Sequence, residues 1–358
     1  RPKTKQANAG LAEDLARLGL YEKVYKPAYD KADGLAQSEG PSLEPGPAQV
    51  VVGVEAVSLN YRDLLMVRGE YNPHLSLPLV PCSDGAGTIL RVGESVGDEL
   101  RVGQRVAGCF AQGWLGGDPP PEVHGQTLGG PRAGVLAEEV LLEAVGVVGV
   151  PSHLSPGEAA CLPCAGVTAW SALHKSGGIR SGEWVLVQGT GGVSTFALQL
   201  AKLAGARVIV TSRSEVKLEA ARALGADATI LTPETPRWGK AARELSGGGV
   251  HLVIEVGGAG SWSESLSACR AGARVAVIGV LSGREATLDF APILMRQLRL
   301  QGVFVGSRSD FLELNAAVSA HSLRPVVDRT LPFGAAHEAF SALERAEHQG
   351  KIVIEVQA

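Results

Sequence analysis

The segment Val185-Leu-Val-Gln-Gly-Thr-Gly-Gly-Val-Ser194 decides the fold of this chain. An apolar run typical of a strand reaches a glycine turn, and the turn opens onto a helical pattern that ends at Gly205. A second apolar run, residues 206–211, follows at once. Strand, glycine turn, helix and strand in this order form the first unit of a dinucleotide-binding fold, in which free backbone N–H groups and the positive helix end face a pyrophosphate.

One residue departs from the Gly-x-Gly-x-x-Gly pattern, because Ser194 stands where the third glycine is expected. Its side chain should loosen the packing of helix against strand slightly, and its hydroxyl could reach a phosphate oxygen. A glycine hairpin in an ordinary α/β domain is the alternative, but the flanking strand and helix argue against it. The turn is therefore predicted to bind a dinucleotide through Gly189, Thr190, Gly191, Gly192 and Val193.

Length and composition set the broad class. The 358 residues are enough for two domains, and the formal net charge of −4 gives no reason to expect nucleic acid or membrane partners. No window approaches the roughly 18 uninterrupted apolar residues of a membrane span. The five scattered cysteines are typical of reduced thiols in a cytoplasmic protein. We expect a cytoplasmic protein that acts on a small-molecule substrate.

The pattern changes along the chain. Short strand-like segments (50–56, 87–92 and 104–107) separated by Pro and Gly fill the first ~160 residues. A helical segment over 158–176 is followed by alternating strands and helices to about Gly306, with later strands predicted at 228–231, 252–256, 274–280 and 298–305. Six strands in this alternation predict an α/β fold with a doubly wound parallel sheet.

A β-rich first half, an inserted nucleotide fold and a short tail suggest that both chain ends build one domain. We expect residues 1–165 and 306–358 to form a substrate domain, with residues 1–25 as an N-terminal extension. Residues 166–305 should form the nucleotide-binding domain. The active site is then expected between the domains, at the carboxyl edge of the parallel sheet.

The end of the second strand sets the cofactor preference. An acidic residue there would bind a ribose 2′-hydroxyl, but Ser212 occupies the position, and Arg213 and Lys217 follow. A hydroxyl and two cations suit a 2′-phosphate, so NADPH is favoured over NADH. A solvated basic loop is the alternative.

Three further motifs carry a family resemblance: Ser-Leu-Asn-Tyr-Arg-Asp-Leu-Leu (58–65), Pro-Cys-Ser-Asp-Gly-Ala-Gly (81–87) and Leu-Pro-Cys-Ala-Gly-Val-Thr-Ala-Trp (162–170). With the glycine turn and the segments 279–283 and 350–353, they make the chain resemble a medium-chain dehydrogenase/reductase from about Tyr29 onward. The likeness is to the quinone-reductase and enoyl-reductase branch. It implies a GroES-like substrate domain beside a Rossmann domain, and a homodimer joined through the edge strand 298–305.

The resemblance also bears on zinc. The three catalytic ligand positions of the zinc-dependent members correspond to Asn60, Ser83 and Cys164 in this chain, and Asn and Ser are not normal zinc ligands. The family's four-cysteine lobe would fall within 108–130, where Cys109 is the one cysteine. Both zinc sites are therefore predicted to be absent.

Without a metal, hydrogen-bond donors must stabilise the substrate oxygen. The predicted catalytic residues are Asn60, Tyr61 and Tyr71, and the resemblance places Tyr71 at the substrate. The two tyrosines could instead be amphipathic rings that line a pocket or the surface. The resemblance implies Thr168 at the nicotinamide ring and Lys351 near the phosphates, with further cofactor contacts at Gly257, Gly279, Val280, Phe304 and Val305.

These features favour a zinc-independent, NADPH-dependent oxidoreductase that reduces a quinone or an activated alkene by hydride transfer. Alcohol or aldehyde redox chemistry, the activity of the zinc branch, is the first alternative. A cofactor-binding structural or interaction protein with little catalysis is the second, since fold alone does not establish function.

Overall fold

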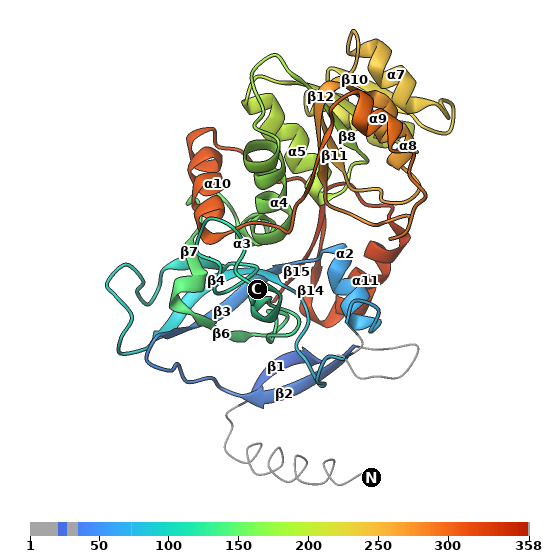
Figure 1. Ribbon diagram of the computed structural model, residues 1–358. Coiled ribbons are helices and arrows are strands. Elements are labelled where there is room, and N and C mark those ends of the chain that lie inside the picture. Colours follow the sequence, from blue (N-terminus) through green and yellow to red (C-terminus); the bar gives the residue numbers. More distant parts are fainter. Residues whose placement is uncertain (1–20, 27–34, 73, 357–358) are drawn as a thin grey trace.

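The six predicted strands of the nucleotide fold lie in one parallel sheet. A computed structural model describes residues 21–26, 35–72 and 74–356 of the chain (Figure 1). The strand order is β10-β9-β8-β11-β12-β13, so the direction of winding reverses between β8 and β11. This confirms the Rossmann-type doubly wound sheet. Its strands are β8 (Trp184–Gln188), β9 (Arg207–Ser212), β10 (Ala228–Leu231), β11 (Val250–Glu255), β12 (Cys269–Val277) and β13 (Arg299–Gly302).

The central strands are apolar at consecutive positions because helices cover both faces of the sheet. Val185 and Val187 belong to the cluster that includes Phe196 of the helix α5 (Gly192–Leu203). Leu186, which points the other way, packs in a second cluster with residues of α7 (Trp238–Leu245) and α8 (Trp262–Ala268). Burial on both sides explains why a continuous apolar run, not an alternating one, marks this fold. The remaining helices of this half are α6 (Glu215–Ala223) and α9 (Ala291–Met295).

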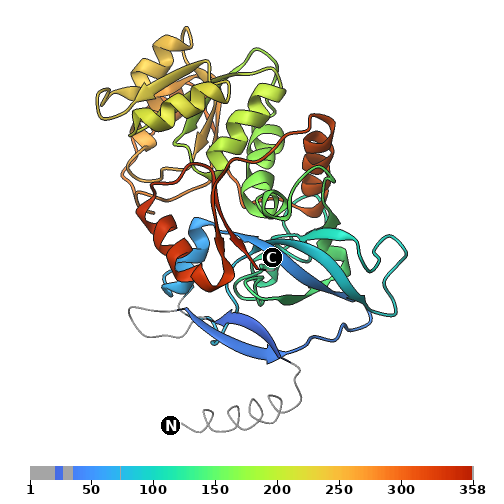
Figure 2. The same cartoon turned by 180° about the vertical axis from the view of Figure 1, so that it is seen from behind.

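A second sheet combines strands from the two ends of the chain, as Figure 2 shows from behind. Its order is β14-β15-β3-β4-β5-β7, and β6 also pairs with β3. The C-terminal strand β15 runs antiparallel to β3 and parallel to β14. The division at residues 165 and 306 stays a prediction, but the mixing of both ends in one sheet agrees with it. The strands are β3 (Gln49–Ser58), β4 (Asp84–Val92), β5 (Arg105–Gly108), β6 (Glu139–Glu143), β7 (Val147–Gly149), β14 (Val327–Pro332) and β15 (Lys351–Glu355).

Part of the predicted N-terminal extension is a strand. β1 (Tyr21–Lys26) pairs antiparallel with β2 (Ala36–Pro41) to form a separate two-stranded sheet. Residues 1–20 lie outside the described residues. Two helices, α2 (Tyr61–Val67) and α11 (Ala336–Arg345), contact one another beside the larger sheet (Figure 1).

The helical segment predicted over 158–176 links the two sheets. It contains α3 (Pro156–Ala160) and α4 (Val167–Trp170), separated and followed by two π-helical stretches, η3 (Leu162–Gly166) and η4 (Ser171–Ser176). Pro163 has no N–H to donate within the helix, which is one reason the regular α-helical pattern breaks there. Another helix, α10 (Arg308–Ala320), packs against α4 and β7.

Two local details differ from the sequence expectations. The edge strand predicted over 298–305 ends at Gly302, and Val305 has φ of 53°, a left-handed conformation that cannot continue a strand. Ser194 does not merely loosen the joint between strand and helix. Its buried Oγ donates a hydrogen bond of 2.7 Å to the carbonyl of Gln188, the last residue of β8. The hydroxyl therefore ties α5 to the strand that precedes it.

Candidate functional site

The glycine turn forms an open cradle at the start of α5. Gly189 has φ of 69°, which favours glycine, and a Cβ on Gly189 or Gly191 would meet no atom within 4 Å. Gly191 caps the helix, so the N–H groups of the first turn have no partner within it. Open space in front of these N–H groups and the positive helix end fits the pyrophosphate of a dinucleotide.

Parallel strands bring several predicted cofactor residues to the same edge of the sheet. Gln188 ends β8, and its Oε1 accepts hydrogen bonds from Val256 N at 3.3 Å and Gly257 N at 3.1 Å after β11. Gly279 follows β12, and a Cβ there would lie 2.3 Å from the Val256 carbonyl. The chain thus turns tightly beside the glycine cradle, as a closely approached cofactor would require.

The end of β9 is where the 2′-phosphate was predicted to bind. Ser212 is buried and Arg213 is exposed. Lys217 Nζ donates to the Ala346 carbonyl at 2.9 Å, and burial lowers the pKa of this ammonium. Burial, followed by the charge of Lys217, lowers the pKa of His348 to about 4. The turn before β15 therefore packs against this loop, and a carbonyl already holds one of the two predicted cations.

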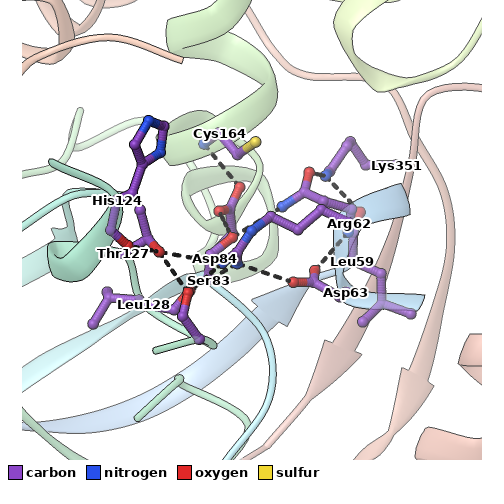
Figure 3. A network of polar contacts seen from close by, with 12 residues as sticks. Leu59, Arg62, Asp63, Ser83, Asp84, His124, Thr127, Leu128, Cys164 and Lys351 are labelled. Carbon is purple, nitrogen blue, oxygen red and sulfur yellow. Dashed lines mark hydrogen bonds and ion pairs between the residues drawn. The ribbon is translucent and has the colours of Figure 1, made fainter. Parts of the chain in front are cut away.

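A chain of polar contacts runs from β15 to β4 (Figure 3). Lys351, buried at the start of β15, donates from Nζ to the carbonyl of Leu59 at 2.6 Å and to Oδ1 of Asn60. Asn60 Nδ2 donates a long hydrogen bond of 3.4 Å to Ser83 Oγ, which donates at 2.7 Å to Asp84 Oδ1. We call Lys351, Asn60, Ser83 and Asp84 the polar relay.

The far end of the polar relay is a fully buried carboxylate. Asp84 Oδ2 accepts the backbone N–H of Cys164 at 2.9 Å. Burial raises the pKa of Asp84, and the positive charge of Lys351 opposes that shift. Burial also raises the pKa of the Cys164 thiol, so the thiol stays protonated. The relay therefore reaches all three positions, Asn60, Ser83 and Cys164, that the family resemblance matches to zinc ligands.

Asn60 owes its position to the start of α2. It is the N-cap residue, and its backbone N–H donates to Asp63 Oδ2 at 2.8 Å. Burial raises the pKa of Asp63 to about 6. The Asp63 carboxylate lies 3.8 Å from Arg62 Nη1, so the pair is in contact, but the capping bond gives Asp63 a structural role.

Arg62 contacts a group of rings that we call the aromatic wall, formed by Tyr71, Phe110, Phe304 and His124. Its guanidinium donates to the carbonyls of Leu128 at 2.8 Å and Gly130 at 2.6 Å, and it lies 4.8 Å from the centroid of the Phe110 ring and 5.2 Å from that of Tyr71. A planar cation between two rings holds both by cation–π attraction. Tyr71 is thereby fixed next to the start of α2.

The aromatic wall continues to the nucleotide half of the protein. The ring of Phe304 meets Phe110 edge-on, with centroids 5.6 Å apart, and lies 4.7 Å from the ring of His124. Tyr71 and Phe304, predicted at the substrate and the cofactor, are thus linked through Arg62 and Phe110. Phe110 and His124 were not predicted from the sequence, and nothing in their local spacing marks them.

Comparison with known proteins now identifies the family. A family model described as "Alcohol dehydrogenase GroES-like domain" matches residues 46–152, and one described as "Zinc-binding dehydrogenase" matches residues 192–320. A zinc-type alcohol dehydrogenase-like protein of Schizosaccharomyces pombe is 41% identical over 317 residues, covering 87% of this chain and 91% of its own. The chain belongs to the medium-chain dehydrogenase/reductase superfamily.

Structural similarity agrees with this membership. A crystal structure assigned as an alcohol dehydrogenase of Sinorhizobium meliloti 1021 has a TM-score of 0.89 and 40% identity, and it covers 94% of this chain and 99% of its own. An acryloyl-coenzyme A reductase of Sulfurisphaera tokodaii is 27% identical, covering 90% of this chain and 96% of its own. This medium-chain dehydrogenase/reductase is therefore an NAD(P)-dependent oxidoreductase. Within the described ranges, no helix is long and apolar enough to cross a membrane.

The residues at the catalytic ligand positions of this medium-chain dehydrogenase/reductase do not fit zinc. Zinc in proteins takes thiolate, imidazole and carboxylate ligands, whereas here an amide and a hydroxyl stand at two of the three positions and Cys164 alone offers a usual ligand. Asn60 and Ser83 are also engaged in the polar relay. Over the part of the chain that the structure describes, no three His, Cys, Asp or Glu side chains gather as a metal site.

The structure places the predicted site residues in three groups. Asn60 and Lys351 are in direct contact, and Gly192 lies against the Lys351 side chain. Tyr61 and Tyr71 are 40% and 39% exposed, and Tyr71 belongs to the aromatic wall whereas Tyr61 does not. The rest lie toward the nucleotide half, with Thr168 and Val305 buried and Val280 exposed.

We predict that Arg62→Met destabilises the protein by about 2–4 kcal/mol, because two buried carbonyls lose a charged donor. Arg68→Met is the matched control, since Arg68 caps the same helix but pairs with an exposed glutamate, and it should cost less than ~1 kcal/mol. Urea unfolding followed by circular dichroism measures both. Equal losses would show that Arg62 does not hold the 127–130 turn.

Proposed function

We propose that this protein is a zinc-independent, NADPH-dependent reductase of quinones or of alkenes activated by a carbonyl group. The polar relay carries the proposal, because hydrogen-bonded groups occupy the positions at which zinc-dependent members hold their metal. The relative named acryloyl-coenzyme A reductase supports an activated alkene as the substrate class. Quinones and activated alkenes make the same chemical demand on the site.

That demand is to hold the cofactor beside an oxygen that becomes negative. When bound, NAD(P)H supplies the hydride. The glycine turn would bind the pyrophosphate through its N–H groups. The turns after β11 and β12, together with Thr168, would line the nicotinamide side. Residues proposed to contact the cofactor are Thr168, Gly189, Thr190, Gly191, Gly192, Val193, Ser212, Arg213, Lys217, Gly257, Gly279, Val280, Phe304 and Val305.

Donors of the chain would stabilise the developing oxyanion. The Asn60 amide can donate from Nδ2, and the hydroxyl of Tyr71 or Tyr61 can donate a hydrogen bond and then a proton. Arg62 holds the Tyr71 ring, so this hydroxyl keeps a defined place relative to the aromatic wall. Donors fixed before the reaction stabilise charge without reorganising, which is their advantage over water.

Reduction of an aldehyde is the second candidate, because the relative of 41% identity is named a zinc-type alcohol dehydrogenase-like protein. The two chemistries differ in the carbon that receives the hydride. An aldehyde receives it at the carbonyl carbon, an enone at the β-carbon. Both leave a negative oxygen.

The substrate class is tested with deuterium-labelled NADPH, deuterated at C4, and three acceptors: 1,4-benzoquinone, cyclohexenone and benzaldehyde. We expect NADPH consumption with the quinone or the enone, and for the enone a deuterium at the β-carbon, detected by NMR of the product. Turnover of benzaldehyde alone, with deuterium on the carbonyl carbon, would contradict the proposal.

The preference for NADPH is tested at the end of β9. Arg213→Ala and Lys217→Ala should each weaken NADPH binding about tenfold or more, because each removes a charged partner of the 2′-phosphate. NADH binding should change little. Arg222→Ala is the control on the same helix, since its guanidinium pairs with Glu215 at 2.7 Å. Equal losses for NADPH and NADH, measured by fluorescence titration, would refute a 2′-phosphate site.

We also propose that two copies join through β13. This strand is the edge of the six-stranded sheet, and Leu300 on it is exposed. Beside it Phe290, Leu294 and Met295 are 70–78% exposed, an apolar surface next to an open strand edge. Pairing of the two edges about a two-fold axis would cover both features.

Met295→Asp should therefore shift the protein from dimer to monomer, because it buries a charge in the proposed contact. Light scattering after size-exclusion chromatography separates the 37.1 kDa chain from a dimer of twice that mass. Val102→Asp is the control at an exposed valine remote from β13, in the turn between β4 and β5, and should leave the dimer intact. A monomeric wild type would refute the proposal.

A further inference from the structure

Lys351 lies between the glycine turn and the start of α2. The preceding residue, Gly350, donates its N–H to the Thr190 carbonyl at 2.8 Å and forms a bridge with Gly191. A Cβ on Gly192 would lie 2.5 Å from Cδ of Lys351. The lysine stem therefore runs along the glycine turn, and its ammonium emerges on the far side.

The ammonium fixes the orientation of the Asn60 side chain. An ammonium group only donates, so the carboxamide must turn its oxygen toward Lys351 and its nitrogen away. The same ammonium binds the Leu59 carbonyl, and Leu59 N donates to the Ile352 carbonyl at 3.0 Å. Asn60 is thus held in two ways. Its side chain bonds to Lys351, and the backbone of the preceding residue, Leu59, bonds to Ile352 of β15.

All hydrogen bonds of the polar relay point the same way. Lys351 donates to Asn60, Asn60 to Ser83, and Ser83 to the carboxylate of Asp84. Each donor in such a series polarises the next, and a full positive charge at one end and a negative charge at the other strengthen the effect. The Asn60 nitrogen carries two N–H bonds, and among the described residues both Ser83 and the carboxylate of Asp84 interact with them. A substrate oxygen beside this half-buried amide would compete with those acceptors for one N–H bond.

We infer that Lys351 is a positioning residue that orients and polarises the Asn60 amide toward the substrate oxygen. In this way an ammonium group of the chain supplies the positive charge at a centre whose residues do not fit zinc. The inference rests on the proposed function. It differs from the sequence expectation that Lys351 contacts the cofactor phosphates, because the two roles affect different steps of the reaction.

The two roles of Lys351 predict different effects on kcat and on the Kd for NADPH. Lys351→Met should lower kcat about tenfold to a hundredfold, the equivalent of one charge-assisted hydrogen bond, and leave the Kd for NADPH within about twofold. Lys351→Arg, which keeps the charge and can still donate to Asn60, should restore part of kcat. Lys202→Met, on α5 and paired with Asp227 at 2.7 Å near the surface, is the lysine control and should change neither value.

A double-mutant cycle tests whether Lys351 acts through Asn60. In an Asn60→Ala background, Lys351→Met should lower kcat no further. Loss of the Lys351 ammonium leaves the buried charge of Asp84 without its cation, so the single variant can fail to fold. The double variant Lys351→Met/Asp84→Asn removes both charges and keeps the test available in that case. The paired variant should fold, bind NADPH normally and show the same low kcat as Asn60→Ala.

Three outcomes would overturn the inference. One is a rise in the NADPH Kd with unchanged kcat in Lys351→Met, which would make Lys351 a phosphate ligand. Another is an equal kcat loss in the presence and absence of the Asn60 side chain. If the wild type is active and either result is found, the inference fails but the proposed function stands. A wild type that turns over neither quinone nor enone overturns the proposed function and this inference with it.

Discussion

The architecture depends on one backbone joint, the hydrogen bond from Gly350 N to the Thr190 carbonyl. Thr190 lies in the glycine turn that follows β8 of the parallel sheet, and Gly350 directly precedes β15 of the second sheet. Gly350 has φ of 70°, and a Cβ there would lie 2.1 Å from the Val326 carbonyl, so a side chain has no room. This joint brings a residue of β15, Lys351, beside both the glycine turn and Asn60. The candidate site exists because the two sheets meet at this point.

Much of the nucleotide half follows from local pattern. The apolar run before Gly189 predicts a strand buried on both faces, and the structure confirms the doubly wound sheet. Short-range details were harder, because β13 ends at Gly302 and no local signal in a valine predicts the left-handed conformation of Val305 three residues later. The sequence suggested that Ser194 loosens the packing or reaches a phosphate oxygen, whereas its hydroxyl donates to the Gln188 carbonyl, a contact that neither expectation included.

Only those residues of the site that belong to a sequence motif could be predicted. Asn60 could be singled out from its motif, but its contact with Lys351 joins residues 291 positions apart, and no spacing rule spans that distance. The aromatic wall is hidden for the same reason, since Phe110 lies in a turn-rich region and meets Arg62 only after folding. Burial raises the pKa values of Asp63 and Asp84, an effect of the folded environment that no local motif reveals. Lys351 and Arg62 offset the cost of holding those carboxylates away from water.

In the proposed site, an amide held by an ammonium group takes the role that a metal has elsewhere in the superfamily. The decisive measurement is the zinc content of the protein, purified from zinc-supplemented cells and measured by inductively coupled plasma mass spectrometry. We expect far less than one zinc per chain, and the same turnover before and after dialysis against a chelator. One tightly held zinc per chain, lost together with activity in a Cys164→Ala variant, would contradict it.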